Sequence, residues 1–363
     1  MDTKNDTGEK STWQIPRLAY LDSLRGLAAC WVVFFHLVYL PDPDLPVPTS
    51  LWLLKVGGMG VTLFFIISSF SLCLTMPRHI ATGRWLLSFY VHRFCRISPL
   101  FYLILAITTI FFVSRGVNIK WSDILINFLY FFNFVPGKQE SIVMAGWAVG
   151  VEVIFYLFFP FIYKVCNTLV KILLLFGLSL IVSYIFKNYI MTTNYFQWSV
   201  LRHLPIFIGG MILFYAIQLL HKLTKYRNIV GLSFFVLGVI TLLCLQYFPP
   251  FLGNSYYNQL FPFGLIMTGL SFAPVTLMVN KFTAFLGKIS YSIYLLHPLL
   301  IIYFLKYFSA IKSCGIEGGL LYLACAGLTF IILLPIAYVS FLFVENPGIN
   351  LGKWVTHKTA SET

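Results

Sequence analysis

The sequence predicts an all-α polytopic membrane protein, a bundle of about ten transmembrane helices with cytoplasmic N- and C-termini. Of the 363 residues, 59% are hydrophobic and only 10% are charged, whereas a soluble domain carries about 25% charged residues. The mean hydropathy is +0.85, and apolar residues gather in runs long enough to cross a bilayer. Basic residues lie in short segments between these runs. The net charge of +13 therefore indicates membrane topology, and we expect no nucleic-acid partner.

Ten runs approach the length of about 20 apolar residues that a transmembrane helix needs. Residues 122–135 (SDILINFLYFFNFV) form a further apolar segment that is too short to span comfortably, and we expect it to be re-entrant or interfacial. The predicted spans are residues 20–40, 57–76, 91–113, 146–165, 169–187, 201–220, 229–247, 257–279, 288–308 and 319–343.

The distribution of Lys and Arg predicts the orientation of these spans. With ten spans and a cytoplasmic N-terminus, cytoplasmic segments hold 16 basic residues and outer segments hold 8, which agrees with the excess of positive charge found on cytoplasmic loops. We therefore predict a cytoplasmic tail at residues 1–16, a transmembrane domain at residues 17–344 and a cytoplasmic tail at residues 345–363.

The seven cysteines form no CxxC pair, and most of them lie inside apolar runs. Cysteine in such a run behaves as a small hydrophobic residue. We therefore expect neither a disulfide framework nor a metal site.

The first predicted span contains three ionisable side chains, Asp22, Arg25 and His36. A charge at the bilayer centre costs about 2.5–3.5 kcal/mol on insertion scales, so such residues are candidates for function. Arg25 and His36 are eleven residues apart, which puts them on one helix face and about 16 Å apart along the axis. Each alone is compatible with a structural role, as a snorkelling arginine or a bundle histidine, but the shared face favours a functional pair.

Two further arginines, Arg93 and Arg96, lie near the cytoplasmic start of the third predicted span. Their spacing of three places them on one helix face. Guanidinium groups bind phosphate with two hydrogen bonds and stay charged, so this pair is a candidate for holding a phosphorylated ligand. The alternative is that both arginines only anchor the helix at the cytoplasmic surface.

Glu152 lies in the outer half of the fourth predicted span, at about the depth of His36. A buried carboxylate needs a partner, and an imidazole at matching depth is a natural one. The carboxylate would fix the tautomer of His36 and leave its other nitrogen free as a base. A structural ion pair that locks two helices is the alternative.

The ninth predicted span begins GKISYSIYLLHPL, in which Ser290, Tyr294 and His297 form one polar stripe. Pro298 follows directly and would loosen the helix near the middle of the membrane. These side chains are candidates for substrate contact or for support of the reacting groups. A packing role beside a helix kink is the alternative.

Five motifs in order resemble the integral-membrane acyltransferase family 3. They are Arg25-x10-His36 following Leu21-Asp22, then GVTLFFIISSFSL, FYVHRFCRISP, WAVGVEVIFYLFFP and GKISYSIYLLHPL, and together they cover nearly the whole chain. Members of this family O-acylate extracytoplasmic sugars and related acceptors. The resemblance implies transfer of an acyl group, usually acetyl, from cytoplasmic acyl-CoA.

The resemblance also implies roles for individual residues. His36 and Glu152 would be catalytic, and Arg25, Arg93 and Arg96 would bind the acetyl-CoA donor. The residues expected to contact substrate or to support the site are Asp22, Trp147, Tyr156, Ser290, Tyr294 and His297.

This chain departs from the family pattern at three positions. Ser23 and Ser69 stand where the family often has Gly, and His92 stands where a first Arg is common. No hydrolase-like domain is visible beside the predicted bundle, so the chain resembles the stand-alone members that acetylate O-antigen or exopolysaccharide.

We therefore expect a membrane O-acetyltransferase of the bacterial cytoplasmic (inner) membrane. Its partners would be acyl-CoA, the lipid bilayer and an extracytoplasmic carbohydrate such as O-antigen or exopolysaccharide, in a free or lipid-linked form. Two alternatives stay open from the sequence. The acceptor would be a small lipophilic or macrolide-type hydroxyl compound, or the buried charges would line the path of a transporter or flippase.

Overall fold

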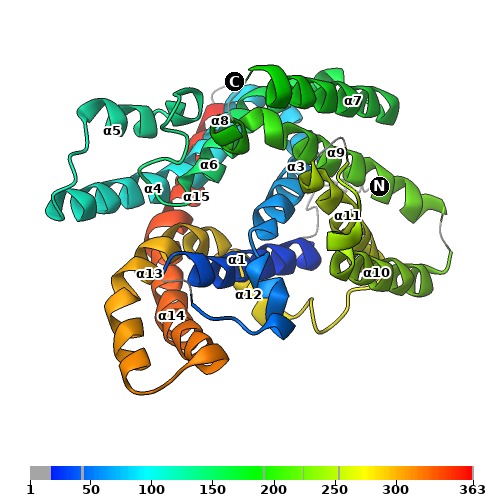
Figure 1. Ribbon diagram of the computed structural model, residues 1–363. Coiled ribbons are helices and arrows are strands. Elements are labelled where there is room, and N and C mark those ends of the chain that lie inside the picture. Colours follow the sequence, from blue (N-terminus) through cyan, green and yellow to red (C-terminus); the bar gives the residue numbers. More distant parts are fainter. Residues whose placement is uncertain (1–17, 42–44, 191–192, 224, 252–253, 362–363) are drawn as a thin grey trace, which may run out of the picture.

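The computed structural model describes residues 18–41, 45–190, 193–223, 225–251 and 254–361, and the regular structure of these residues is helical (Figure 1). The α-helices are α1 (Ala19–Tyr39), α2 (Trp52–Lys55), α3 (Met59–Ile80), α4 (Trp85–Ser114), α5 (Trp121–Phe128), α6 (Gly146–Val165), α7 (Leu169–Ile185), α8 (Thr193–Trp198), α9 (Val200–Leu223), α10 (Arg227–Leu243), α11 (Leu260–Phe272), α12 (Lys281–Lys288), α13 (Ser290–Ser313), α14 (Gly318–Ser340) and α15 (Asn346–Ser361). Short 3₁₀ turns cover Thr49–Leu51, Phe131–Phe134, Leu245–Tyr247 and Ser255–Gln259, and π-helical turns cover Phe186–Ile190 and Phe341–Glu345.

The predicted all-helical, multi-pass fold is confirmed. Eight helical segments of the described chain are long and apolar enough to cross a membrane, so the number of helices is roughly as predicted. The predicted spans 229–247 and 257–279 correspond to the shorter helices α10 and α11, of 17 and 13 residues. These two helices pack tightly on each other. A Cβ at Gly269 would lie only 2.5 Å from the backbone nitrogen of Phe235, so the helices meet this closely only because residue 269 is glycine.

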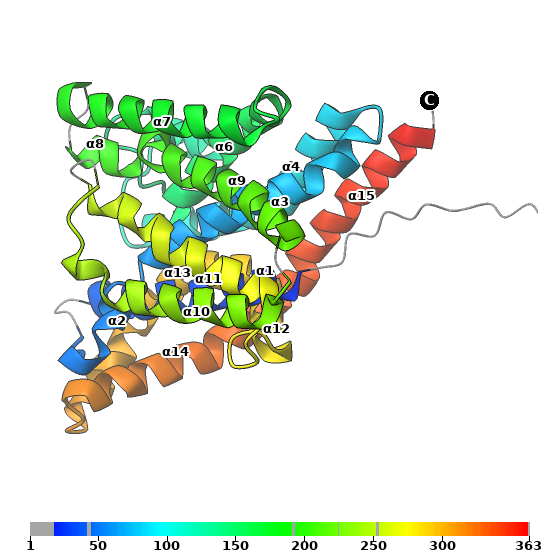
Figure 2. The ribbon, with the colours of Figure 1, turned by 90° about the vertical axis from the view of Figure 1, so that its right-hand side faces the viewer.

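The ambiguous segment 122–135 does not form a spanning helix. It overlaps α5, a helix of eight residues that begins at Trp121, and then contains the 3₁₀ turn Phe131–Phe134. Of the two predicted tails, the structure describes only the C-terminal one. Residues 1–16 lie outside the described residues, whereas residues 346–361 form α15, which continues α14 through the π-helical turn and lies beside α4 (Figure 2).

Helix α1 lies in the middle of the bundle (Figure 1) and packs closely on its neighbours through glycine. A Cβ at Gly26 would lie 2.6 Å from the backbone nitrogen of Gly287, at the end of α12. A Cβ at Gly60, on α3, would lie 2.6 Å from the carbonyl oxygen of Ala28. Real Cβ atoms do not approach so closely, so only glycine lets these backbones meet. The first half of α1 is thereby fixed in position.

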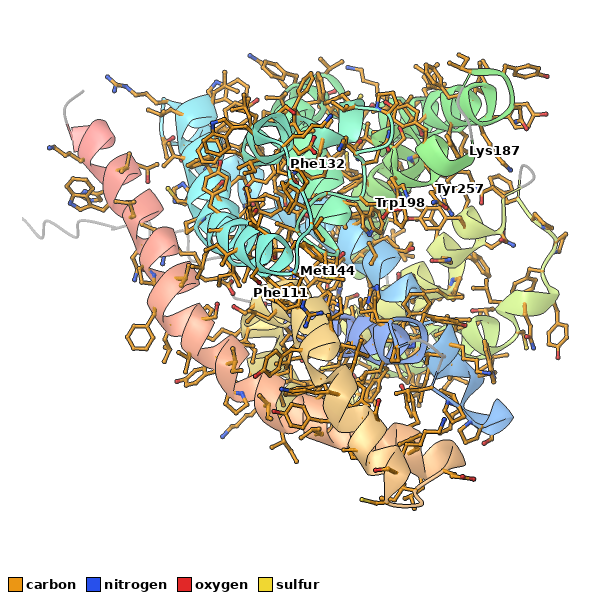
Figure 3. All side chains as sticks on the ribbon, turned by 60° about the vertical axis from the view of Figure 1, so that its left-hand side comes forward. Phe111, Phe132, Met144, Lys187, Trp198 and Tyr257 are labelled. Carbon is orange, nitrogen blue, oxygen red and sulfur yellow. The ribbon has the colours of Figure 1, made fainter. Side chains whose placement is uncertain are left out.

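Large apolar side chains cover the outside of the bundle, where the sticks in Figure 3 are mostly carbon. Leu174 is 70% exposed, Ile331 is 73% exposed and Phe343 is 75% exposed. Side chains of this kind favour hydrocarbon over water. The outer surface is therefore that of an integral membrane protein.

Candidate active site

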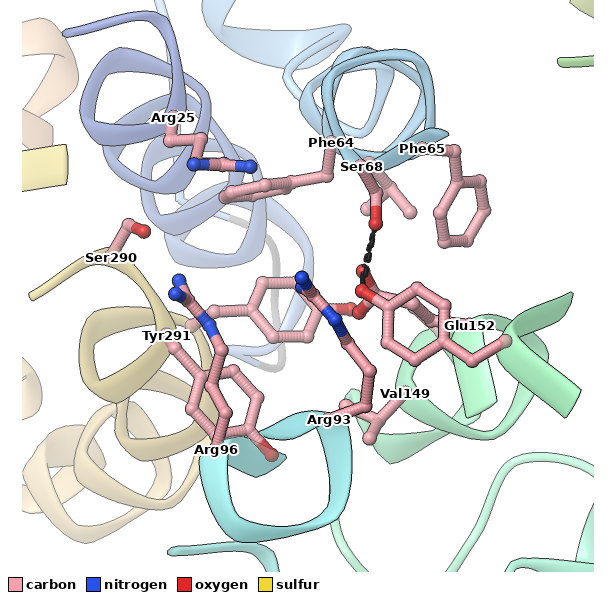
Figure 4. A pocket seen from close by; sticks show the side chains of 14 residues that line it. Arg25, Phe64, Phe65, Ser68, Arg93, Arg96, Val149, Glu152, Ser290 and Tyr291 are labelled. Carbon is pink, nitrogen blue, oxygen red and sulfur yellow. Dashed lines mark hydrogen bonds between the residues drawn. The ribbon is translucent and has the colours of Figure 1, made fainter. Parts of the chain in front are cut away.

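A polar pocket of about 90 Å³ lies inside the bundle, between α1, α3, α4, α6 and α13 (Figure 4). Most of its polar lining comes from residues that the sequence had marked as candidates. These are Arg25, Arg93, Arg96, Glu152, Tyr156, Ser290 and Tyr294. The fold thus brings together side chains from four separate motifs.

Three guanidinium groups point into the same space in Figure 4, one from α1 and two from α4. Arg25 donates a hydrogen bond of 2.8 Å to Ser71 Oγ, and its Nη1 lies 3.7 Å from Oδ1 of Asp22. Arg93 makes a long contact of 3.5 Å to Thr75 Oγ1, and its buried Nε–H has no hydrogen-bond partner among the described residues. A buried donor without a partner is costly unless a ligand supplies the acceptor.

One carboxylate faces these three cations. Glu152 Oε1 accepts a hydrogen bond of 2.5 Å from Ser68 Oγ and a second, short one from the hydroxyl of Tyr156. The Ser68 and Tyr156 hydroxyls also lie 2.8 Å apart, so the three groups form one network. Glu152 in the pocket lining and Asp22 beside Arg25 are two carboxylates against three guanidinium groups, so the pocket keeps excess positive charge and suits an anionic ligand.

The two predicted histidines form a pair in the described structure. His297 Nε2 lies 2.9 Å from His36 Nδ1. Each Nδ1 also faces a backbone carbonyl four residues earlier, that of Val32 for His36 and that of Ile293 for His297. Carbonyl oxygens only accept, so both Nδ1 atoms carry hydrogen, and His297 Nε2 accepts from His36. His36 Nε2 has no hydrogen-bond partner among the described residues, so in this tautomer its lone pair is available as a base.

The predicted contact between Glu152 and His36 is wrong. Glu152 bonds to side chains of α3 and α6, whereas His36 bonds to α13. Position along a helix predicts the height of each residue in the membrane but not the direction in which its side chain points. The group that contacts His36 is His297.

Tyr294 lies between the arginine pocket and the histidine pair. Its ring lines the pocket, and its centroid lies 5.8 Å from the ring of His297 and 5.8 Å from that of Phe64. The Tyr294 hydroxyl donates a 2.9 Å hydrogen bond to the carbonyl of Ala145, which ties α13 to the start of α6. Ser290, one turn earlier, donates to the carbonyl of Gly287 and thus serves its own helix start.

Trp147 lies behind the pocket wall and does not line the cavity. Its ring centroid is 6.3 Å from that of Phe65, which does line the pocket, and 4.8 Å from that of Trp198. It also packs 5.2 Å from His203, which is fully buried and bonds to the Tyr256 hydroxyl at 2.7 Å. Sequence reasoning missed His203 as well as Ser68, although each is a polar residue inside an apolar run.

Asp22 does not line the arginine pocket but a larger chamber next to it, which shares Arg25 and Arg96 with the pocket. The described part of the chain contains no group of three or more His, Cys, Asp or Glu side chains with the arrangement of a metal site.

Comparison with known proteins gives a family for this arrangement. Residues 18–344 match the profile of a family described as "Acyltransferase domain". A protein of Acidianus two-tailed virus that is provisionally named an acetyltransferase is 26% identical, over 78% of this chain and 83% of the viral protein. Two proteins provisionally named O-acetyltransferases, from Staphylococcus aureus strains COL and MSSA476, are 26% and 25% identical over 97% of this chain.

The chain spans 61% of the length of those staphylococcal proteins. No solved structure gives a significant match. Because the family match covers nearly the whole chain, the chain belongs to this acyltransferase family. It is an integral membrane enzyme that transfers acyl groups other than aminoacyl groups.

Proposed function

We propose that this member of the acyltransferase family moves an acetyl group from cytoplasmic acetyl-CoA to a hydroxyl of an extracytoplasmic glycan. An O-antigen or exopolysaccharide, free or lipid-linked, has the required chemistry. The observation that carries the proposal is the position of the arginine pocket beside a histidine pair whose outer imidazole keeps a free Nε2. The provisional names of the staphylococcal relatives support the O-acetyl part of the proposal.

The arginine pocket would hold the diphosphate of the donor. Arg25 and Arg96 line both the pocket and the adjacent chamber, so a diphosphate between them would place the pantetheine arm in the narrow pocket. The unpartnered Nε–H of Arg93 supports this placement, because a phosphate or amide oxygen of the donor would accept from it. Glu152 would hold Tyr156 and Ser68 in place and balance part of the positive charge.

His36 would act as the general base. The acceptor oxygen attacks the thioester carbon as His36 Nε2 takes the hydroxyl proton, and the carbon–sulfur bond breaks. The proton then passes to the departing thiolate, so the products are the acetyl ester and free CoA. His297 would hold the imidazole of His36 in the tautomer that leaves Nε2 free. A route through an acetyl-imidazole on the same Nε2 uses the same groups.

The two ends of α1 support a sidedness for the proposed reaction. The arginine pocket lies toward the start of α1, at the end of the bundle where basic residues gather, so we place it on the cytoplasmic side. His36 is at the other end of α1 and would meet an acceptor from outside. The enzyme would reside in the bacterial cytoplasmic membrane.

The direct test uses purified protein in lipid nanodiscs with radiolabelled acetyl-CoA. We expect saturable donor binding and slow hydrolysis without acceptor, and label in glycan when cell-surface polysaccharide is added. Mass and NMR analysis of surface glycan from cells with and without the gene would then locate the new ester. If label appears only in a small lipophilic hydroxyl compound, that compound class and not a glycan is the acceptor. Transport is tested separately, with the protein reconstituted in closed lipid vesicles. Absence of donor binding, together with passage of a solute across the vesicle membrane, would favour a transporter.

A further inference from the structure

We infer that α15 completes a second phosphate-binding chamber, which recognises the 3′-phosphate of the donor nucleotide through Lys353 and Lys288. The inference rests on the proposed acetyl-CoA donor. It places the nucleoside and its 3′-phosphate, for which the inner pocket has no room, in the larger chamber. Residues 346–361 lie beyond the segment matched by the family profile, which ends at residue 344. The matched segment alone therefore does not contain the α15 wall of this chamber.

The chamber has a volume of about 520 Å³, against about 90 Å³ for the inner pocket. It is lined from the start of α1, the end of α3, the junction of α12 and α13, and the beginning of α15. Arg25 and Arg96 line both spaces, so a ligand that contacts these two guanidinium groups is in reach of both. A diphosphate there would leave its nucleoside in the larger chamber.

The chamber carries more positive than negative charge. Five basic side chains line it, namely Arg25, Arg78, Arg96, Lys288 and Lys353, against the carboxylates of Asp22 and Glu345. Both carboxylates already have partners, because Asp22 lies beside Arg25 and Glu345 accepts a short hydrogen bond from Ser292. No described carboxylate forms an ion pair with Lys288 or Lys353.

The position of Lys353 is fixed by how α15 packs. Asn346, Ile349 and Lys353 follow one another at intervals of three and four residues and line the chamber from one helix face. The neighbouring face carries Gly348 and Gly352, which press against Cys95 of α4. A Cβ at Gly348 would lie 2.4 Å from the carbonyl oxygen of Cys95, so α15 is held close to α4. Figure 2 shows the two helices side by side.

Coenzyme A has phosphate groups at two separate places, the diphosphate and the 3′-phosphate of the ribose. With the diphosphate between Arg25 and Arg96, the ribose lies away from the thioester arm and thus in the larger chamber. Lys288 and Lys353 are the basic groups that the chamber has beyond its arginines. An ammonium group of this kind binds a phosphate as a point charge.

The test compares acetyl-CoA with acetyl-dephospho-CoA, which lacks only the 3′-phosphate, in the full-length protein. We expect wild-type protein to have a KM about tenfold lower for acetyl-CoA, as one charge-assisted contact predicts. Lys353→Gln should raise the KM for acetyl-CoA several-fold, leave the KM for acetyl-dephospho-CoA unchanged and leave kcat unchanged. Lys288→Gln should behave in the same way.

Lys358→Gln is the matched control, since Lys358 is exposed on the same helix and its ammonium lies 5.5 Å from the Trp354 ring, outside the chamber. It should keep the wild-type preference between the two donors. Equal KM values for both donors in wild-type protein would overturn the α15 assignment alone. An equal loss with both donors in Lys353→Gln would do the same. Failure of wild-type protein to bind either donor would instead overturn the proposed function.

Discussion

The arginine pocket and the histidine pair lie along the same helix but are built differently. The pocket draws charged side chains from three helices, and its positive charge exceeds the negative charge beside it. The histidine pair consists of two imidazole rings on two helices, joined by one hydrogen bond and each held by a backbone carbonyl. Charge at the first site suits binding of an anion, whereas a free lone pair at the second suits movement of a proton. The variants below test this division, from the largest expected effect to the smallest.

His36→Ala should cause the largest loss, because it removes the free Nε2 that we assign as the base. We expect acetyl transfer to fall by about 10²- to 10⁴-fold. Donor binding, measured by isothermal titration, should stay near the wild-type value, because we place the donor head among the arginines and not at His36. A folded His36→Ala protein that modifies glycan at the normal rate would contradict the division into binding and reacting ends.

Arg25→Lys should weaken donor use about tenfold or more in KM, because an ammonium group cannot reproduce the two-pronged contact of a guanidinium group with phosphate. The variant keeps a positive charge beside Asp22 and should keep the fold. Steady-state kinetics over a range of acetyl-CoA concentrations gives the KM. If the KM is unchanged and only kcat falls, Arg25 belongs with the reacting groups.

His297→Ala should lower kcat about tenfold, which is the worth of one hydrogen bond that orients His36. Combined with His36→Ala it should cost nothing further, since both act through one imidazole. His297→Gln should recover part of the rate, because its side-chain oxygen can accept from His36 Nδ1–H.

Glu152→Gln combined with His36→Ala is the double variant to compare with His297→Ala combined with His36→Ala. Its contacts are with Ser68 and Tyr156, so its effect should add to that of His36→Ala. Rates of the two single variants and the double variant give the coupling directly. Strong coupling between Glu152 and His36, with none between His297 and His36, would restore the pairing that we expected from the sequence.

Cysteine labelling tests which end faces outward, with no expected change in rate. Cys314 is exposed just after α13, at the end opposite the arginine pocket. Cys244 is exposed too, so the experiment uses a Cys244→Ser background. A membrane-impermeant maleimide should then label Cys314 in intact cells, and adding Cys314→Ser should remove that label. Labelling of Cys314 only after the cells are opened would reverse the orientation and place the arginine pocket outside.

The sequence predicted the fold class and most of the polar lining of the pocket. Composition and apolar runs suffice for a helical membrane bundle, and ionisable residues in such runs are rare enough to stand out. The pairing of Glu152 failed because distance along a helix gives depth but not direction. Lys353 escaped notice because α15 looked like a polar tail, and its place beside Lys288 depends on contacts between residues far apart in the chain.

Tyr294 has a consequence for the membrane itself. A site of the kind proposed, which takes a donor from one side and an acceptor from the other, is also a path for ions through the bilayer unless something blocks it. The Tyr294 ring stands between the two halves, with Phe64 against it and its hydroxyl held by Ala145. An apolar ring at a constriction excludes water, and without water ions do not pass. We therefore expect the side chain that borders the reaction pocket also to keep the bilayer insulating, so that Tyr294→Ala should let protons leak through vesicles that contain the enzyme.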